Sequence, residues 1–144
     1  MIEYKRIKDL REDNDYTQDY VAEYLKVNRS SYANWENGDN IIPLDILDKL
    51  TLLYNVPIAY FINKRTQYNK NTKIKPINYE VLLNKIIWHK EENNLSYQDI
   101  ADFLKVSKST AYKYYTSQYN ITIDILVLLS ELTKCNIDEL CGKI

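Results

Sequence analysis

The sequence predicts an all-α protein built from two similar domains. Glycine and proline, which interrupt helices, number only 2 and 3 among 144 residues. Apolar residues recur at helical spacing from the first residues onward. A shift of 79 residues aligns residues 7–61 with residues 86–140 without a gap, and 15 of these 55 positions are identical. Most matches are apolar, so the repeated feature is a core, and two copies of one small domain follow.

Positive charge is concentrated between the two copies. The net charge is −1, but residues 1–63 carry −4, residues 64–76 carry +5 and residues 77–144 carry −2. The segment NKRTQYNKNTKIKP is polar and lacks helical spacing, which is typical of a linker. We therefore expect a first domain over 1–62, a basic linker over 63–76 and a second domain over 77–144.

Composition and motifs argue against several classes of protein. No apolar run approaches the roughly 18 residues of a membrane span, and the charged N-terminus is no signal peptide. Cys135 and Cys141 lack the spacing of a metal site, so two reduced thiols and a cytoplasmic location are expected. His89 aligns with Leu10 and is expected to be a half-buried structural residue. With no glycine-rich phosphate loop, we expect no enzyme, cofactor, metal or small-molecule ligand.

Five short helices are expected in the first copy. Tyr4, Ile7 and Leu10 have the helical spacing of the first. Thr17 can cap the second, QDYVAEYL, because its hydroxyl can accept an unpaired N–H of the first turn. The stripe of this helix predicted to be buried consists of Val21, Tyr24 and Leu25.

The third expected helix, RSSYANWEN, follows the second after only about three residues. Asn28 can cap it, and Gly38 can end it in the left-handed conformation. Tyr32 and Trp35, three residues apart, are expected to face inward. Two helices joined by so short a turn have the geometry of a helix-turn-helix.

The remaining elements follow from local signals. Pro43 suits the first turn of a fourth helix, and VPIAYFI is expected to form a short fifth. In the second copy Ser96 and Ser107 occupy the two cap positions, and Asn78 can cap a longer first helix. Each copy is thus expected to hold five helices.

The segment TQDYVAEYLKVNRSSYANWENG resembles the lambda-repressor/Cro-like, or XRE-type, helix-turn-helix family. The shared pattern is Ser/Thr-Gln, an alanine, a Leu-x-Val turn, a Ser/Thr-rich recognition helix and Trp-Glu-Asn-Gly. The match covers residues 4–62, and over residues 82–141 it rests largely on the repeat. The resemblance implies two tandem five-helix lambda-repressor-like DNA-binding domains. Lys26 and Lys105 stand where the turn of this family often holds glycine.

The resemblance also implies roles for individual residues of the first copy. The implied DNA-binding residues are Gln18, Asn28, Arg29, Ser30, Ser31, Asn34 and Asn37. Gln18 would contact a phosphate, whereas Arg29 and Asn34, with Ser30, would face base edges in the major groove, where Arg suits guanine and Asn suits adenine. The other three would contact the DNA backbone or cap helices. Arg11 and Glu36 would pair, which makes Glu36 structural.

The second copy departs from this pattern. Tyr97 replaces Gln18, and YYTS replaces WENG, which removes an acidic partner for Lys90. The exposed side of its third helix is expected to hold Lys108, Tyr112, Lys113 and Tyr115. The residues predicted to contact DNA are Ser107, Lys108, Ser109, Tyr112 and Lys113. Either this helix contacts DNA, or it belongs to a degenerate copy kept for packing or dimerisation.

The predicted function is that of a sequence-specific transcriptional regulator, a repressor, that binds double-stranded DNA. The third helix of the first domain, and of the second if that copy binds DNA, would read the major groove. Extended, residues 63–76 would reach roughly 45–50 Å, which exceeds the ~34 Å between successive major grooves. One chain could therefore supply two recognition helices, and a homodimer four. The linker lysines would be either a solvated tether or an arm along phosphates.

The sequence also leaves a second class of function open. The protein could be an interaction module, such as an antitoxin or an inhibitor of another protein, with DNA binding secondary. A tyrosine-rich surface and an acidic face would favour it. The residues concerned are Tyr112, Tyr115 and Tyr119 for the first, and Asp13, Asp15, Asp19 and Glu23 for the second.

Overall fold

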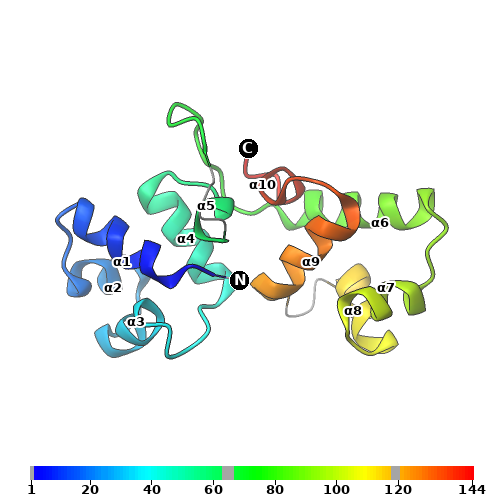
Figure 1. Ribbon diagram of the computed structural model, residues 1–144, viewed down its shortest axis with the longest axis horizontal. Helices are drawn as coiled ribbons and strands as arrows, with labels where there is room; N and C mark the ends of the chain where they lie inside the picture. The colour runs from blue at the N-terminus through cyan, green and yellow to red at the C-terminus, as the bar shows by residue number, and fades with distance from the viewer. Residues whose placement is uncertain (1, 63–66, 118–120) are drawn as a thin grey trace. The chain divides into compact units, whose positions relative to one another are not determined.

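The computed structural model describes residues 2–62, 67–117 and 121–144 (Figure 1). Over these residues the chain forms ten helices and no strand, which confirms the predicted all-α class. It divides into two compact units, Met1–Ile74 and Lys75–Ile144. Each unit holds five helices within the described residues.

The first unit packs its helices around one apolar core. The helices are α1 (Tyr4–Asp13), α2 (Gln18–Leu25), α3 (Arg29–Glu36), α4 (Leu44–Tyr54) and α5 (Ile58–Ile62). α3 packs against α1 and α2, and α4 packs against α2 and α5. The core side chains include Ile7, Val21, Leu25, Tyr32, Leu47, Leu50, Ile58 and Phe61. Burying these side chains is what stabilises helices of five to eleven residues, which are marginal in isolation.

The predicted N-caps of α2 and α3 are present. The Thr17 hydroxyl accepts a hydrogen bond from the Tyr20 N–H at 3.0 Å. Asn28 Oδ1 accepts one from the Ser31 N–H at 2.7 Å. Each bond satisfies a donor that has no partner within the helix, so both helices begin where the sequence indicates.

The end of α3 and the start of α4 also follow local signals. Gly38 has φ +77° and its N–H donates to the Trp35 carbonyl at 3.1 Å, as predicted for a left-handed helix end. Pro43 was predicted in the first turn of α4 but occupies the cap position instead. Its ψ of 148° is extended, and its carbonyl accepts the first helical bond, from the Leu47 N–H.

Two predictions of burial need correction. Tyr24 was expected in the core stripe of α2 but is 43% exposed. The buried face of this helix consists of Val21, Ala22 and Leu25, and Tyr24 lies at its edge. Trp35 was expected to face inward but is only half-buried. In α3 the fully inward positions are Tyr32 and, one turn later, Glu36.

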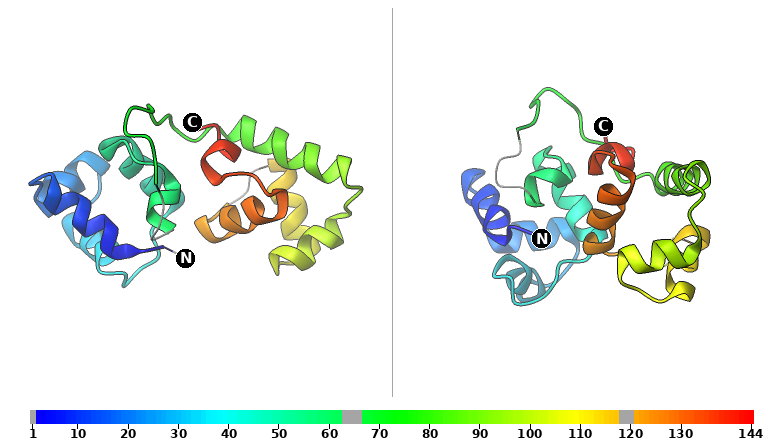
Figure 2. Two further views of the ribbon diagram at one scale, coloured as in Figure 1. Left: turned by 45° about the horizontal axis from the view of Figure 1, so that its top comes forward. Right: turned by 45° about the vertical axis from the view of Figure 1, so that its right-hand side comes forward.

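The second unit repeats the same order of helices. They are α6 (Tyr79–Glu92), α7 (Tyr97–Leu104), α8 (Lys108–Ser117), α9 (Ile123–Thr133) and α10 (Ile137–Leu140), all visible in Figure 2. The core side chains include Leu82, Ile86, Ile100, Leu104, Ala111, Leu126, Leu129 and Leu140. Asn78 caps α6 and Ser96 caps α7, the latter in a reciprocal capping box with Asp99, as the sequence predicts for both caps.

His89 and the two cysteines, which were set aside on sequence grounds, lie in the second unit. His89 is half-buried, and Cys135 and Cys141 form no disulfide. The described residues include no group of three or more His, Cys, Asp or Glu that could hold a metal ion. Across the described part of the chain, every helix is too short or too polar to cross a membrane.

The left-handed turn between the two helices of each helix-turn-helix generates a stability prediction. Lys26 and Lys105 both have φ +58°, a conformation that costs a side-chain-bearing residue about 1 kcal/mol. We expect Lys26→Gly to stabilise the first unit by about 0.5–1 kcal/mol, and Lys26→Ala not to. Denaturant unfolding followed by Trp35 fluorescence, with Trp88→Phe as background, measures this. Equal effects of Gly and Ala would contradict it.

Candidate nucleic-acid interface

The turn between α2 and α3 sets the position of the candidate reading helix. Lys26 ends α2 in the left-handed region, and the Val27 N–H returns to the Ala22 carbonyl at 3.0 Å. Asn28 then caps α3. Because the turn is so short, the first residue of α3, Arg29, lies near the start of α2, and its side chain is exposed.

The residues predicted to contact DNA in the first unit lie on the outer side of this motif. Asn28, Arg29, Ser30 and Asn37 are exposed, and Gln18, Ser31 and Asn34 are half-buried. Asn28 uses its side-chain oxygen for two local bonds, from the Ser31 N–H and from the Ser30 hydroxyl at 2.9 Å. It therefore acts as a helix cap in the free protein.

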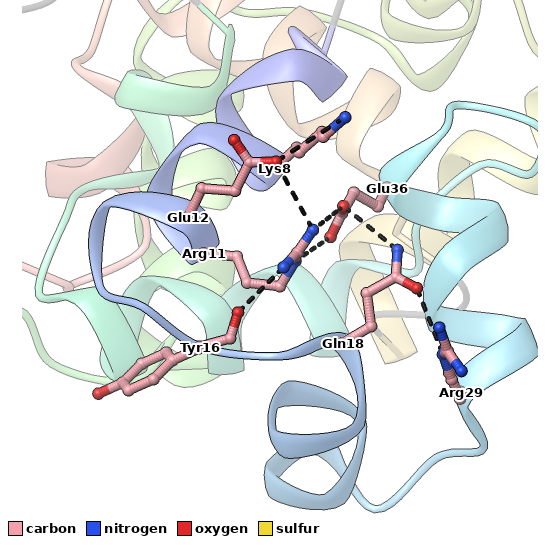
Figure 3. A network of polar contacts seen from close by, with 7 residues as sticks. All are labelled: Lys8, Arg11, Glu12, Tyr16, Gln18, Arg29 and Glu36. Atoms are coloured by element: carbon pink, nitrogen blue, oxygen red, sulfur yellow. Dashed lines mark hydrogen bonds and ion pairs between the residues drawn. The ribbon is translucent and has the colours of Figure 1, made fainter.

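A buried ion pair connects α1 to the end of α3 (Figure 3). Arg11 Nε donates to Glu36 Oε2 and Arg11 Nη2 donates to Glu36 Oε1, both at 2.8 Å. Arg11 Nη1 donates to the Tyr16 carbonyl at 2.9 Å, which ties in the loop before α2. Glu36 is only 4% exposed. The predicted pairing is confirmed, and its bidentate geometry fixes α1, the α1–α2 loop and α3 together.

The same carboxylate orients the side chains at the surface of the motif. Gln18 Nε2 donates to Glu36 Oε1 at 3.4 Å, which turns Gln18 Oε1 outward to accept from Arg29 Nε, also at 3.4 Å. Figure 3 shows these contacts as one continuous chain from Arg11 to Arg29. Both outer bonds are long, so they bias the orientation of Arg29 rather than hold it rigidly.

Glu36 is ionised in the folded protein over the whole neutral range. Burial acts to raise the pKa of its carboxyl, but hydrogen bonds from Arg11 and the charge of its guanidinium outweigh burial. The pKa of Glu36 therefore lies below its ordinary value of 4.5. The ion pair contributes its full stabilisation at pH values above the ordinary pKa of 4.5. This stabilisation is lost as the pH falls from there through the lowered pKa of the folded protein.

The second unit replaces this ion pair with an aromatic cluster. Lys90 Nζ lies 4.4 Å from the centre of the Tyr97 ring, a cation–π contact. The Tyr97 ring packs edge-on against Tyr115 at 6.0 Å and against Tyr112 at 5.2 Å. The face of the Tyr97 ring thus stabilises the charge of Lys90.

Tyr115 was predicted to be exposed, and this prediction is wrong. The side chain is 2% exposed, and burial raises the pKa of its hydroxyl. The repeat explains the error: Lys90, Tyr97 and Tyr115 align with Arg11, Gln18 and Glu36, so Tyr115 occupies the buried position of the carboxylate. All three partners of the polar network differ between the two copies. This joint replacement was the sequence signal that could have revealed the aromatic cluster.

The outer face of α8 remains polar and basic. Ser107, Lys108, Ser109, Tyr112 and Lys113, the residues predicted to contact DNA here, are all exposed. The Ser107 hydroxyl accepts from the Thr110 N–H at 3.1 Å and so caps the helix. Tyr119, which the sequence assigned to a possible partner surface, lies outside the described residues.

Comparison with known proteins identifies this architecture. The sequence model of the helix-turn-helix family matches the chain twice, over residues 7–61 and 88–140. The chain belongs to the XRE-type helix-turn-helix family. The two matches confirm two helix-turn-helix domains in tandem and the internal repeat. The family is one of DNA-binding regulators and is not a class of enzymes.

Two curated proteins illustrate the relationship. The cryptic phage CTXphi transcriptional repressor RstR of Vibrio cholerae is 33% identical over 70 residues, which are 49% of this chain and 62% of that protein. The HTH-type transcriptional regulator ImmR of Bacillus subtilis (strain 168) is 36% identical over 67 residues, 46% of this chain and 53% of that protein. The chain thus spans less than two thirds of either relative. No solved structure matches it significantly.

The buried ion pair yields a prediction for stability and its pH dependence. Glu36→Gln should destabilise the first unit by about 3 kcal/mol at pH 7, because it leaves the Arg11 charge without its buried counter-charge. Since the pKa of Glu36 is lowered, the difference from the unaltered protein should shrink below about pH 4.5. Unfolding followed by Trp35 fluorescence in the Trp88→Phe background, from pH 3 to 7, measures both.

Tyr115→Phe is the matched control for this experiment. It changes the aligned position of the second unit, where the Tyr115 hydroxyl has no hydrogen-bond partner among the described residues. We expect little loss of stability and no pH dependence between pH 3 and 7. A Glu36→Gln difference that stays constant down to pH 3 would contradict the assigned role of the ion pair.

Proposed function

We propose that this protein is a sequence-specific DNA-binding transcriptional regulator, a repressor, whose α3 reads base edges in the major groove. The observation that carries the proposal is the placement of Arg29. Its exposed guanidinium stands at the start of α3 and is linked through Gln18 to the buried Arg11–Glu36 pair. A charged side chain oriented by a buried network, yet open to solvent, suits a ligand of opposite charge or rich in acceptors.

The chemistry of the α3 face suits direct readout. Arg29 uses its Nε toward Gln18, and no described residue accepts a hydrogen bond from its two Nη groups. Those groups can donate to the two major-groove acceptors of a guanine. Ser30 and Asn34 lie one helical turn apart on the same side, and an Asn side chain matches the donor and acceptor of adenine. Gln18 and the N-terminus of α2 suit a phosphate.

The α8 face suits phosphate contacts rather than base readout. Lys108 and Lys113 offer single ammonium groups, which attract phosphates but lack the two-pronged geometry that distinguishes bases. Tyr97, in place of Gln18, turns its ring toward Tyr112 and offers no amide to orient Lys108. We therefore propose that the first domain supplies sequence specificity and the second mainly affinity, with one chain supplying both helices.

The relatives support the repressor role. One is described as a phage transcriptional repressor and another as a transcriptional regulator. A repressor of this kind binds an operator and hinders polymerase. Because each match covers only part of the relative, the repressor role belongs to this proposal and rests on the shared helix-turn-helix.

The alternative of a protein-interaction module has less support. The acidic residues proposed for it, Asp13, Asp15, Asp19 and Glu23, are exposed as it requires. The proposed tyrosine surface, however, lacks Tyr115, which lies in the core. Asp19 also lies 3.9 Å from Arg29 Nε, beside the proposed reading helix.

The role of α3 is tested by Arg29→Ala combined with Asn34→Ala. We expect specific binding to weaken by about 1–3 kcal/mol for each base that is no longer bonded, with little change on unrelated DNA. The measurement is the ratio of two affinities, one for a duplex selected by the protein from random sequences and one for a scrambled duplex. Lys49→Ala, an exposed charge on α4, is the control. An unchanged ratio would exclude α3 as the reader.

The role of α8 is tested by Lys108→Ala combined with Lys113→Ala. We expect affinity to fall by the same factor on the selected and scrambled duplexes, and the slope of log affinity against log salt to decrease by about 2. Titrations at several salt concentrations measure both. A decrease confined to the selected duplex would show that α8 reads bases, and no decrease would make the second domain a scaffold.

A further inference from the structure

The guanidinium of Arg29 lies beside two different acceptors at the start of α2. Its Nε donates to the Gln18 amide oxygen at 3.4 Å, and the same Nε lies 3.9 Å from Asp19 Oδ1. Gln18 and Asp19 are the first two residues of α2, and the Thr17 cap fixes where that helix begins. The turn between α2 and α3 therefore brings a carboxylate, as well as an amide, to the side chain proposed to read DNA.

The contact between Asp19 and Arg29 contributes little to the stability of the first unit. The two side chains are 75% and 65% exposed, and an ion pair in such surroundings is screened by water and salt. An acidic residue in the first turn also suits the helix dipole, but that effect depends on its position in α2 and not on Arg29. Neither effect accounts for a carboxylate beside the reading side chain, which leaves a role in binding.

The second unit carries no carboxylate at the aligned position. Gln98 aligns with Asp19, and Lys108 aligns with Arg29. The Gln98 amide donates to Asp102 Oδ1, one turn later on α7, at 2.8 Å. The copy whose α8 suits phosphate contacts thus has an uncharged residue where the copy proposed to read bases has a carboxylate.

A carboxylate beside an arginine distinguishes the two kinds of acceptor that DNA offers. Each phosphate carries a negative charge, whereas the acceptors on a guanine edge are neutral. Two like charges in water repel one another enough to weaken binding roughly fivefold at about 4 Å and roughly twofold at about 8 Å. Asp19 therefore opposes the approach of a phosphate to the Nη groups of Arg29 and leaves the approach of a base edge unopposed.

We propose that Asp19 is a specificity-determining residue, which keeps Arg29 from binding phosphates and so leaves it for base edges. The inference rests on the proposed function of α3. It adds a repulsive element against unrelated DNA to the attractive contacts with the selected sequence, and both increase the difference between the two affinities. In this role Asp19 acts through Arg29 and is a positioning residue.

Asp19→Asn tests the proposal, because the amide keeps the shape of the side chain and removes its charge. We expect the affinity for the scrambled duplex to rise about two- to fivefold and the affinity for the selected duplex to change less, so that their ratio falls. On the scrambled duplex the slope of log affinity against log salt should increase by about 1, since Arg29 then reaches a phosphate. Titrations of both duplexes at several salt concentrations measure these changes.

Glu23→Gln is the matched control. Glu23 is exposed, lies one turn after Asp19 on the same helix and carries the same charge. Its replacement should change the affinity by the same factor on both duplexes and leave the ratio as it is. An equal fall of the ratio in both variants would mean that net charge alone acts, which would overturn the proposal. An unchanged ratio in Asp19→Asn would overturn it as well.

The Arg29→Ala background decides whether Asp19 acts through Arg29. In that background Asp19→Asn should no longer change the ratio, because the side chain that it positions is gone. A role of Asp19 in the helix dipole, or in repelling a phosphate at the start of α2, would act equally with and without Arg29. A change of the ratio that has the same size in both backgrounds would therefore contradict the inference.

The outcomes separate this inference from the proposed function. If Arg29→Ala alone leaves the ratio of the two affinities unchanged, α3 is not the reader, and the proposed function and the inference fail together. If Arg29→Ala lowers the ratio and Asp19→Asn does not, α3 reads DNA and the inference fails alone.

Discussion

The arrangement of the first domain depends on one buried ion pair. Arg11 and Glu36 bring together two helices and a loop, each of which would be marginal alone. The same carboxylate orients Gln18, which in turn orients Arg29 at the surface. A contact that stabilises the fold thus also biases the direction of Arg29, the side chain proposed to read DNA. A polar pair suits this position better than an apolar one, because hydrogen bonds transmit orientation.

The second domain connects the corresponding three helices without a buried carboxylate. Lys90 on the face of Tyr97, and Tyr115 in the buried position, connect α6, α7 and α8 through aromatic contacts. These contacts fill space but offer no hydrogen bond toward Lys108. Among the described residues, the aromatic contacts keep the fold of this domain without orienting Lys108, the first side chain of α8. Divergence of the buried network therefore accounts for the proposed difference in function between the two copies.

Sequence alone predicts the features that depend on local chemistry. The caps at Thr17, Asn28 and Ser96 and the left-handed Gly38 follow from side chains within three residues of the bond they make. The pairing of Arg11 with Glu36 joins residues 25 positions apart, and it was predictable only through the family resemblance.

Features set by tertiary packing escaped prediction. Tyr115 was assigned to the surface because helical spacing from Tyr112 places it there, whereas packing against Tyr97 buries it. The Asn55 side chain joins the end of α4 to the backbone of Thr72 and Ile74, 17 and 19 residues away, and such side-chain to backbone bonds leave no periodic signal. Asn69 likewise accepts a hydrogen bond from the Asn71 N–H, which forms a local turn of the kind that asparagine favours.

The central claim is that one chain carries two unequal DNA-contacting domains, of which the first specifies the sequence. Purine methylation interference on the duplex selected by the protein, read beside its hydroxyl-radical footprint, tests this most directly. The account predicts two protected backbone segments, with interference by purine methylation in the major groove confined to one of them. Equal interference in both segments, or a single protected segment, would contradict it.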